Sequence, residues 1–242
     1  MRSILLPLAL LIIAALYAAV GHGGASGYLA LMALMGYPQE VMRPSALLLN
    51  LFVSGISFAQ FARAGHFRWR LFWPFALTSI PLAFIGAGIT LDPLIYKRVL
   101  GVCLLFAVAR LFGLFGRQGA DPRPVNLPLA LFIGAALGLI SGIIGIGGGI
   151  LLSPVLLLFR WADTKGTAAV SAPFIFVNSA AGLLGVLKVG EQPGADMLIW
   201  VGAALLGGLL GGHVGAVRLA EGRLKHVLAT VLLLASVKLL FA

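Results

Sequence analysis

Two glycine-rich stretches decide how this chain folds: residues 21–24 read Gly-His-Gly-Gly, and residues 145–149 read Gly-Ile-Gly-Gly-Gly. Each stretch interrupts a long apolar run and is followed by about ten more apolar residues. A break inside a membrane helix frees backbone N–H groups, which membrane proteins use to build binding sites at mid-depth. The two stretches therefore predict a substrate site between two broken helices.

The composition indicates a membrane protein. The chain has 242 residues, of which 61% are hydrophobic and 10% are charged, and its mean hydropathy is +1.08. A soluble domain of this size could not cover such a core with so little polar surface. Apolar stretches of membrane-spanning length recur along the chain. We therefore expect an all-α, multi-pass protein of the cell membrane (the plasma or inner membrane).

The apolar segments occur twice in the order long, short, long, long, long. The first series covers residues 4–20, 28–37, 44–62, 71–89 and 99–115, and the second covers 128–144, 150–159, 168–187, 198–217 and 227–241. This order predicts a first membrane repeat over residues 1–115, a polar linker over 116–127 and a second membrane repeat over 128–242. Residues 2–19 resemble a secretory signal peptide, but because the repeat includes them we expect them to be retained.

Glycines and charges repeat together with the segment lengths. Gly21, Gly23 and Gly24 precede Gly145, Gly147 and Gly148 by 124 residues. Ser45-Ala46 precedes Ser171-Ala172 by 126, and Lys97-Arg98 precedes Lys225-His226 by 128. Chance similarity between leucine-rich helices does not keep glycines and charges in the same order, so we interpret the pattern as a duplication.

The first broken segment, residues 4–37, is too long for one span. As a single helix it would reach roughly 50 Å, whereas the hydrocarbon core is about 30 Å thick. If each broken segment folds back as a re-entrant hairpin, each half keeps about three transmembrane helices and the halves form an inverted repeat. If each broken segment crosses instead, the halves are parallel.

The distribution of Lys and Arg favours the hairpin alternative. The hairpin alternative places 11 of the Lys and Arg residues on one side of the membrane and 6 on the other, whereas the crossing alternative places 9 and 8. Cytoplasmic loops carry the excess of positive charge, so the hairpin alternative places both termini outside the cytoplasm. The residues on its cytoplasmic side are Arg63, Arg68, Arg70, Arg110, Arg117, Arg123, Arg160, Lys165, Arg218, Arg223 and Lys225.

The charged residues also restrict the partners. The net charge of +10 comes from clusters between apolar spans, and we expect most of these basic residues in solvated loops, so we predict no nucleic-acid partner. All seven acidic residues fall in predicted loops or at helix ends. Cation transporters and many proton pumps place carboxylates at mid-membrane, so their absence there favours an anionic or neutral substrate. With Cys103 as the single cysteine, no internal disulfide or Cys-based metal site is possible, and we predict no metal and no cofactor.

The glycine stretches and nearby polar residues are the candidate substrate-binding residues. Glycine lets the backbone approach a ligand, and the N-terminus of the short helix that follows presents unpaired N–H groups. Hydroxyl and amide side chains can donate to an anion without changing charge, and His22 could bind it when protonated. Close helix packing and interhelical hydrogen bonds are the alternative roles. The candidates are Gly21, His22, Gly23, Gly24, Ser45, Asn50, Gly147, Gly148, Gly149, Ser171 and Asn178.

Several motifs resemble the sulfite exporter family, TauE/SafE, over nearly the whole chain. In the second half these are G-I-G-G-G-I-L-L-S-P (145–154), V-S-A-P-F (170–174) and V-N-S-A-A-G-L-L-G (177–185). The first half is similar through G-H-G-G-A-S-G-Y-L (21–29), S-A-L-L-L-N (45–50) and A-G-H-F-R-W-R-L (64–71). His22 and Ala25 depart from the fuller glycine run of the second half. The resemblance implies transport of a small sulfur-containing or organic anion such as sulfite, sulfoacetate or thiosulfate.

We therefore predict a secondary transporter of a small anion that works by alternating access between its two repeats. The predicted partners are this anion and the lipid bilayer. The sequence leaves open whether a coupling ion (proton or sodium) takes part and whether the chain forms a homo-oligomer. A membrane-embedded enzyme is the first alternative, but the spans offer no carboxylate and few histidines for catalysis, so we predict no enzyme activity. A non-transporting assembly subunit is the second.

Overall fold

The computed structural model describes the chain except for residues 1, 20–21, 115–122, 218–220 and 242. All regular secondary structure in these described residues is α-helical, which confirms the predicted class. The first half contains α1 (Arg2–Ala19), α2 (Ala25–Leu34), α3 (Gln39–Arg63), α4 (Trp69–Ala87) and α5 (Pro93–Leu111). The second contains α6 (Leu127–Ile144), α7 (Gly149–Leu158), α8 (Thr164–Lys188), α9 (Met197–Val217) and α10 (Glu221–Phe241).

Glycine forms the helix breaks at both predicted places. Gly24 precedes α2 with φ of 101°, and Gly148 precedes α7 with φ of 75°. Gly145 ends α6 with φ of 86°. Side chains with a Cβ rarely adopt this left-handed conformation, which explains why glycine occupies these positions. The two breaks therefore follow from the local sequence.

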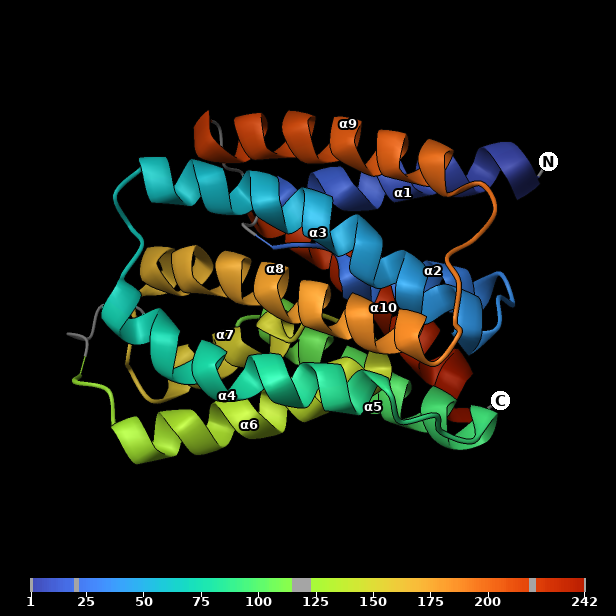
Figure 1. Cartoon of the computed structure of the whole chain (residues 1–242). Helices are drawn as coiled ribbons and strands as arrows, with labels where there is room; N and C mark the ends of the chain where they lie inside the picture. Colours follow the sequence, from blue (N-terminus) through green and yellow to red (C-terminus); the bar gives the residue numbers. More distant parts are fainter. Residues whose placement is uncertain (1, 20–21, 115–122, 218–220, 242) are drawn as a thin grey trace.

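The chain reverses direction after α1. A Cβ added to Gly27 in α2 would lie 2.6 Å from Cγ2 of Ile13 and 2.8 Å from Cε2 of Tyr17, both in α1. In one continuous helix, Ile13 and Gly27 would be about 21 Å apart along the axis. Figure 1 also places the N-terminus at the end of the bundle opposite the α3–α4 connection. This is the arrangement expected if the first broken segment is a hairpin.

The two halves pack extensively against each other. The most extensive contacts join α4 to α6 and α1 to α9, and α3 packs against α8 while α5 packs against α10. Figure 1 shows α1 beside α9 along one side of the bundle and α4 beside α6 along the other. The core therefore lies between the halves rather than inside each one.

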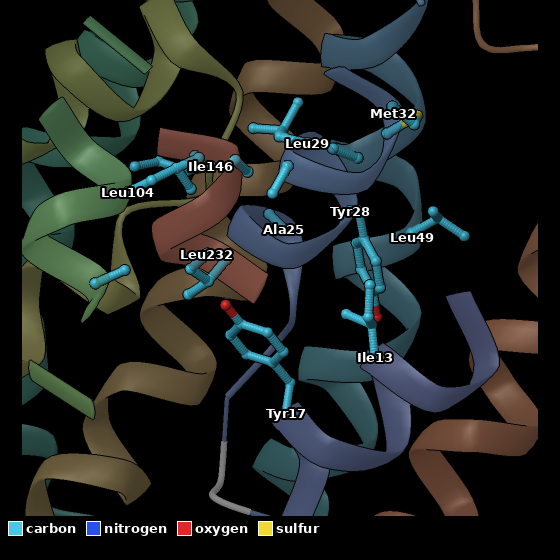
Figure 2. Close-up of a cluster of buried hydrophobic side chains, with 14 of the residues drawn as sticks. Ile13, Tyr17, Ala25, Tyr28, Leu29, Met32, Leu49, Leu104, Ile146 and Leu232 are labelled. Atoms are coloured by element: carbon cyan, nitrogen blue, oxygen red, sulfur yellow. The ribbon is translucent and has the colours of Figure 1, made fainter. Parts of the chain in front are cut away.

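The short helix α2 lies in this core. Its buried residues face every direction around the helix, which is typical of a helix surrounded by others. Figure 2 shows side chains from several helices gathered around it. The labelled ones are Ile13 and Tyr17 of α1, Ala25, Tyr28, Leu29 and Met32 of α2, Leu49 of α3, Leu104 of α5, Leu232 of α10, and Ile146 in the second glycine stretch.

The outer surfaces of the helices suit a lipid environment. Within the described residues, four helices have the length and hydropathy to cross a membrane: Gln39–Arg63, Trp69–Ala87, Leu127–Ile144 and Lys165–Lys188. Large apolar side chains such as Leu198, Phe132 and Leu210 are 90%, 72% and 60% exposed. Because so much exposed apolar surface would be unfavourable in water, the structure agrees with a multi-pass membrane protein.

The topology can be tested by cysteine labelling in a Cys103→Ala background. Ala64 follows α3, and the exposed Leu94 is the second residue of α5, which begins at the end of the bundle that carries both termini. We expect a membrane-impermeant thiol reagent to label Ala64→Cys from the cytoplasmic side and Leu94→Cys from the opposite side. Labelling of both from one side, or in the reverse order, would contradict the charge-based orientation.

Candidate functional site

Asn50 of α3 connects the two glycine stretches. Its Oδ1 accepts a hydrogen bond of 2.9 Å from the N–H of Ala25, the first residue of α2. Its Nδ2 donates to the carbonyl of Ile146, in the second glycine stretch, and to Oγ of Ser179, both at 3.3 Å. Asn50 is buried, so these bonds have no competition from bulk water. One amide thus joins the start of α2 to the break between α6 and α7.

Two glycines make room for Asn50. A Cβ added to Gly23 would lie 2.6 Å from Asn50 Oδ1. A Cβ added to Gly147 would lie 2.6 Å from Asn50 Nδ2 and 2.6 Å from Ser179 Oγ, and Gly147 has φ of 71°. No side chain fits at either position without moving the amide. Close approach of the backbone to Asn50 therefore explains these glycines.

His22 begins a second polar connection between the halves. Its Nε2 lies 3.0 Å from Oγ of Ser153 in α7, and this Oγ lies 2.8 Å from Oγ of Ser171 in α8. Ser153 also donates to the carbonyl of Gly149 at 2.9 Å. Because a hydroxyl has one proton to donate, Ser153 then accepts from both His22 and Ser171. This assignment places a proton on Nε2 of His22.

The space between the two stretches is small. Its volume is about 10 Å³, which is room for about one water molecule. His22 and Asn50 line it with Tyr17, Ser26 and Ile175, and the Tyr17 hydroxyl lies 2.5 Å from Ser26 Oγ. The structure is therefore closed around the predicted site.

The other candidate glycines lie around this cavity or behind it. Gly24 lines it together with Gly23. Gly148 packs against Phe174 and Ser141, and Gly149, the first residue of α7, packs closely against Ile175. Gly21 lies outside the described residues.

The hydrogen-bonded residues around the cavity form one polar cluster: Tyr17, His22, Ser26, Asn50, Ser153, Ser171 and Ser179. The structure does not bring Ser45 or Asn178 into this cluster. Ser45 accepts a hydrogen bond of 3.0 Å from the N–H of Gly194, in the connection between α8 and α9. Asn178 donates to the carbonyl of Phe174, one turn earlier in its own helix, at 2.8 Å. Although Ser45 corresponds to Ser171 in the repeat, the two serines have different partners.

Several residues of the cluster were not among the predicted ones. Ser153 lies within an apolar run, and Tyr17 and Ser26 flank the first break. Ser179 directly follows a predicted residue, Asn178. A buried serine can instead donate a hydrogen bond to a carbonyl of its own helix, so the sequence alone gives no signal that separates the serines of the cluster from other buried serines.

Arg43 is an exception to the expectation that most basic residues lie in solvated loops. It is in the second turn of α3 and only 1% exposed, and its Nη1 lies 2.7 Å from Oε1 of Glu191. Arg43 differs because its side chain reaches the carbonyls of Ala87 in α4 and Gly142 in α6 as well as Glu191 in the α8–α9 connection. Among the described residues, no three His, Cys, Asp or Glu side chains gather as a group that could hold a metal.

Comparisons with known proteins agree with this architecture. The family model described as sulfite exporter TauE/SafE matches residues 6–239. A probable membrane transporter protein of Sinorhizobium fredii, y4hK, is 36% identical, and the alignment covers 99% of both chains. A probable membrane transporter protein of Bacillus subtilis, YjnA, is 26% identical over 95% of this chain and 96% of its own. No solved structure matches. The chain is a membrane transporter that belongs to the sulfite exporter TauE/SafE family.

Proposed function

We propose that this protein is a secondary transporter of a small anion, either a sulfur-containing oxyanion or an organosulfonate of the sulfite, thiosulfate or sulfoacetate type. The observation that carries the proposal is the meeting of the two glycine stretches at Asn50, with His22 on the same cavity. The family description, sulfite exporter, supports the substrate class.

The chemistry of the cavity favours an anion. Asn50 has an amide donor and His22 a ring N–H; both now bond to groups of the second half, so separation of the halves would free them for an anion. The positive N-terminal end of α2 lies beside the same space. The carboxylates with described positions lie at helix ends or in connections, such as Glu40 in the first turn of α3 and Asp163 before α8. An anion would therefore meet donors there without a repelling carboxylate.

Alternating access would let an anion reach a cavity that is now closed. The helix pairings are those of a two-fold relation that exchanges the halves: α1 with α9 becomes α6 with α4, while α3 with α8 and α5 with α10 map onto themselves. The pairings support a duplication, and the opposite directions of the corresponding helices α3 and α8 in Figure 1 support the predicted inverted repeat. We propose that the halves separate at the glycine stretches, first toward one side of the membrane and then toward the other.

Counterflow in proteoliposomes tests the proposal. Purified protein is reconstituted with unlabelled anion inside, and entry of labelled sulfite, thiosulfate or sulfoacetate is measured against small carboxylates. We expect saturable exchange of at least one sulfur anion, and no specific flux with cations alone. Metal-cation uptake without an anion requirement would contradict the proposal, and no flux of any solute would favour an assembly subunit.

A further inference from the structure

The Arg43–Glu191 ion pair joins the two halves at the end of the bundle that carries the chain termini. Nη1 of Arg43 donates to Glu191 Oε1 at 2.7 Å. Nη2 donates to the carbonyl of Ala87, which ends α4, at 2.5 Å and to that of Gly142 in α6 at 3.4 Å. One guanidinium thus holds together α3, α4, α6 and the connection after α8.

This pair leaves hydrogen-bonding groups unused. Nε of Arg43 and Oε2 of Glu191 are both buried and have no hydrogen-bond partner. A carboxylate usually engages an arginine with two parallel bonds, whereas this one makes a single bond. Buried polar atoms without a partner are rare in native proteins and call for an explanation. The guanidinium retains a free donor that a second oxyanion could use.

Arg43 lies in α3 between the start of that helix and Asn50 at the cavity. Arg43 and Asn50 are seven residues apart in α3, so they share one face of the helix and are about 10 Å apart along its axis. A Cβ added to Gly145, at the start of the second glycine stretch, would lie 3.2 Å from Cα and Cβ of Arg43. The arginine is therefore adjacent to the stretch that closes the cavity.

The position of Glu191 in the chain would let it separate from Arg43. It lies in the connection between α8 and α9, outside the helices, whereas Arg43 is fixed within α3. A connection moves at lower cost than a packed helix because fewer buried contacts hold it. Separation of the halves at this end would pull the two charges apart.

We propose that Arg43 is a second anion-binding residue of the transport pathway, and that the transported anion displaces Glu191 from it. The inference rests on the proposed function. While no anion is bound, Glu191 neutralises the buried guanidinium and closes this end of the pathway. An entering oxyanion takes two donors of the guanidinium and then passes two turns down α3 to the cavity at Asn50.

The pKa of Glu191 agrees with this exchange. Burial raises it from its ordinary value to about 7, against the opposing effect of Arg43 and with a small contribution from Glu40. Tyr96 of α5 is a further titratable group that interacts with both members of the pair. As the pH falls through about 7, Glu191 takes up a proton and releases Arg43. Anion binding at Arg43 is therefore expected to strengthen at lower pH.

Two variants move the Michaelis constant in opposite directions. Glu191→Gln removes the competing carboxylate. At about pH 8 only about a tenth of the protein has Glu191 protonated, so this change should lower KM about tenfold. The double variant Arg43→Gln/Glu191→Gln removes both charges and leaves none unpaired in the interior, so it should fold. Its KM should rise about tenfold or more through loss of a charged donor.

The pH profile and a matched control complete the test. Uptake is measured with thiosulfate or sulfoacetate, whose charge is constant between about pH 6 and about pH 8. The parent should show about a tenfold lower KM at the lower pH, and Glu191→Gln should show no change. Arg98→Gln, which removes an exposed cation at the same end, should behave as the parent.

Separate outcomes overturn the two proposals. If the parent exchanges a sulfur anion but the double variant, melting within a few degrees of it, keeps the parent KM, Arg43 is not an anion-binding residue. The same conclusion follows if Glu191→Gln keeps both the parent KM and its pH dependence. If the parent carries no anion at all, the proposed function itself fails.

Discussion

We expect Asn50→Asp to abolish anion transport in folded protein, because under the proposed function it places a carboxylate where the substrate needs a donor. Asp has nearly the shape of Asn and can still accept from the N–H of Ala25. It cannot donate to Ile146 or Ser179, and its charge repels an anion in the cavity. Two like charges about 4 Å apart at an effective dielectric constant of about 20 repel by about 4 kcal/mol. We expect transport efficiency to fall at least about a hundredfold.

The corresponding asparagine of the second half is the matched control. Asn178 bonds to its own helix, so Asn178→Ala should leave the KM for the anion unchanged. Asn50→Ala should raise it at least about tenfold, since a hydrogen bond to a charged group contributes about 1.5–3 kcal/mol. Uptake kinetics and a melting curve are measured for each variant. Normal transport by an Asn50→Asp protein that melts like the parent would remove Asn50 from the site.

Gly147→Ala should also abolish transport, through a methyl group that displaces Asn50 and Ser179. Both neighbouring atoms would lie 2.6 Å from the new Cβ, so both side chains must shift. The substitution also strains the backbone, because Gly147 has φ of 71°. We expect uptake at least about a hundredfold below the parent, because this shift breaks the bonds that join the two halves.

Gly65→Ala separates the backbone strain from the collision. Gly65 lies between α3 and α4 with φ of 76°, and a Cβ added there would meet nothing within 4 Å. Both substitutions therefore carry the same conformational cost of about 1–2 kcal/mol, which a melting curve reports. Only Gly147→Ala should lose transport. Equal transport by the two variants would show that Gly147 is required for the turn and not for the site.

The sequence predicted the order of the helices well because the membrane imposes a strong pattern on it. Apolar runs of spanning length and the glycines at Gly24, Gly145 and Gly148 are local signals, and the structure confirms a helix break at each glycine. The short helix α2 was expected at about residue 28, whereas it begins at Ala25. Backbone geometry explains the difference, since a left-handed Gly24 already starts the next helix.

The partners of the polar residues could not be predicted in the same way. The repeat preserves backbone spacing, but position 22 is histidine in one half and position 146 is isoleucine in the other. Ser153 corresponds to Leu29 in the same register. The hydrogen-bonded connection from His22 to Ser153 therefore has no counterpart, and symmetry in the sequence overstated the symmetry of the site.

The Arg43–Glu191 pair was missed for a different reason. The two residues are 148 positions apart, and each lies near the end of an apolar segment, where charges normally contact water. The sequence around each residue does not show whether its charge contacts a lipid headgroup or forms a buried ion pair. Only the packing of α3 against the second half reveals which one is formed.

The single-water volume of the closed cavity has a bioenergetic consequence. A cell membrane stores energy as a voltage, and each elementary charge that leaks through it dissipates about 2.3 kcal/mol per 100 mV. Protons and small ions cross proteins along continuous files of water, and a space of about 10 Å³ interrupts such a file. Under the proposed function, the closed protein therefore does not discharge the membrane, and current flows only when a bound anion is carried across.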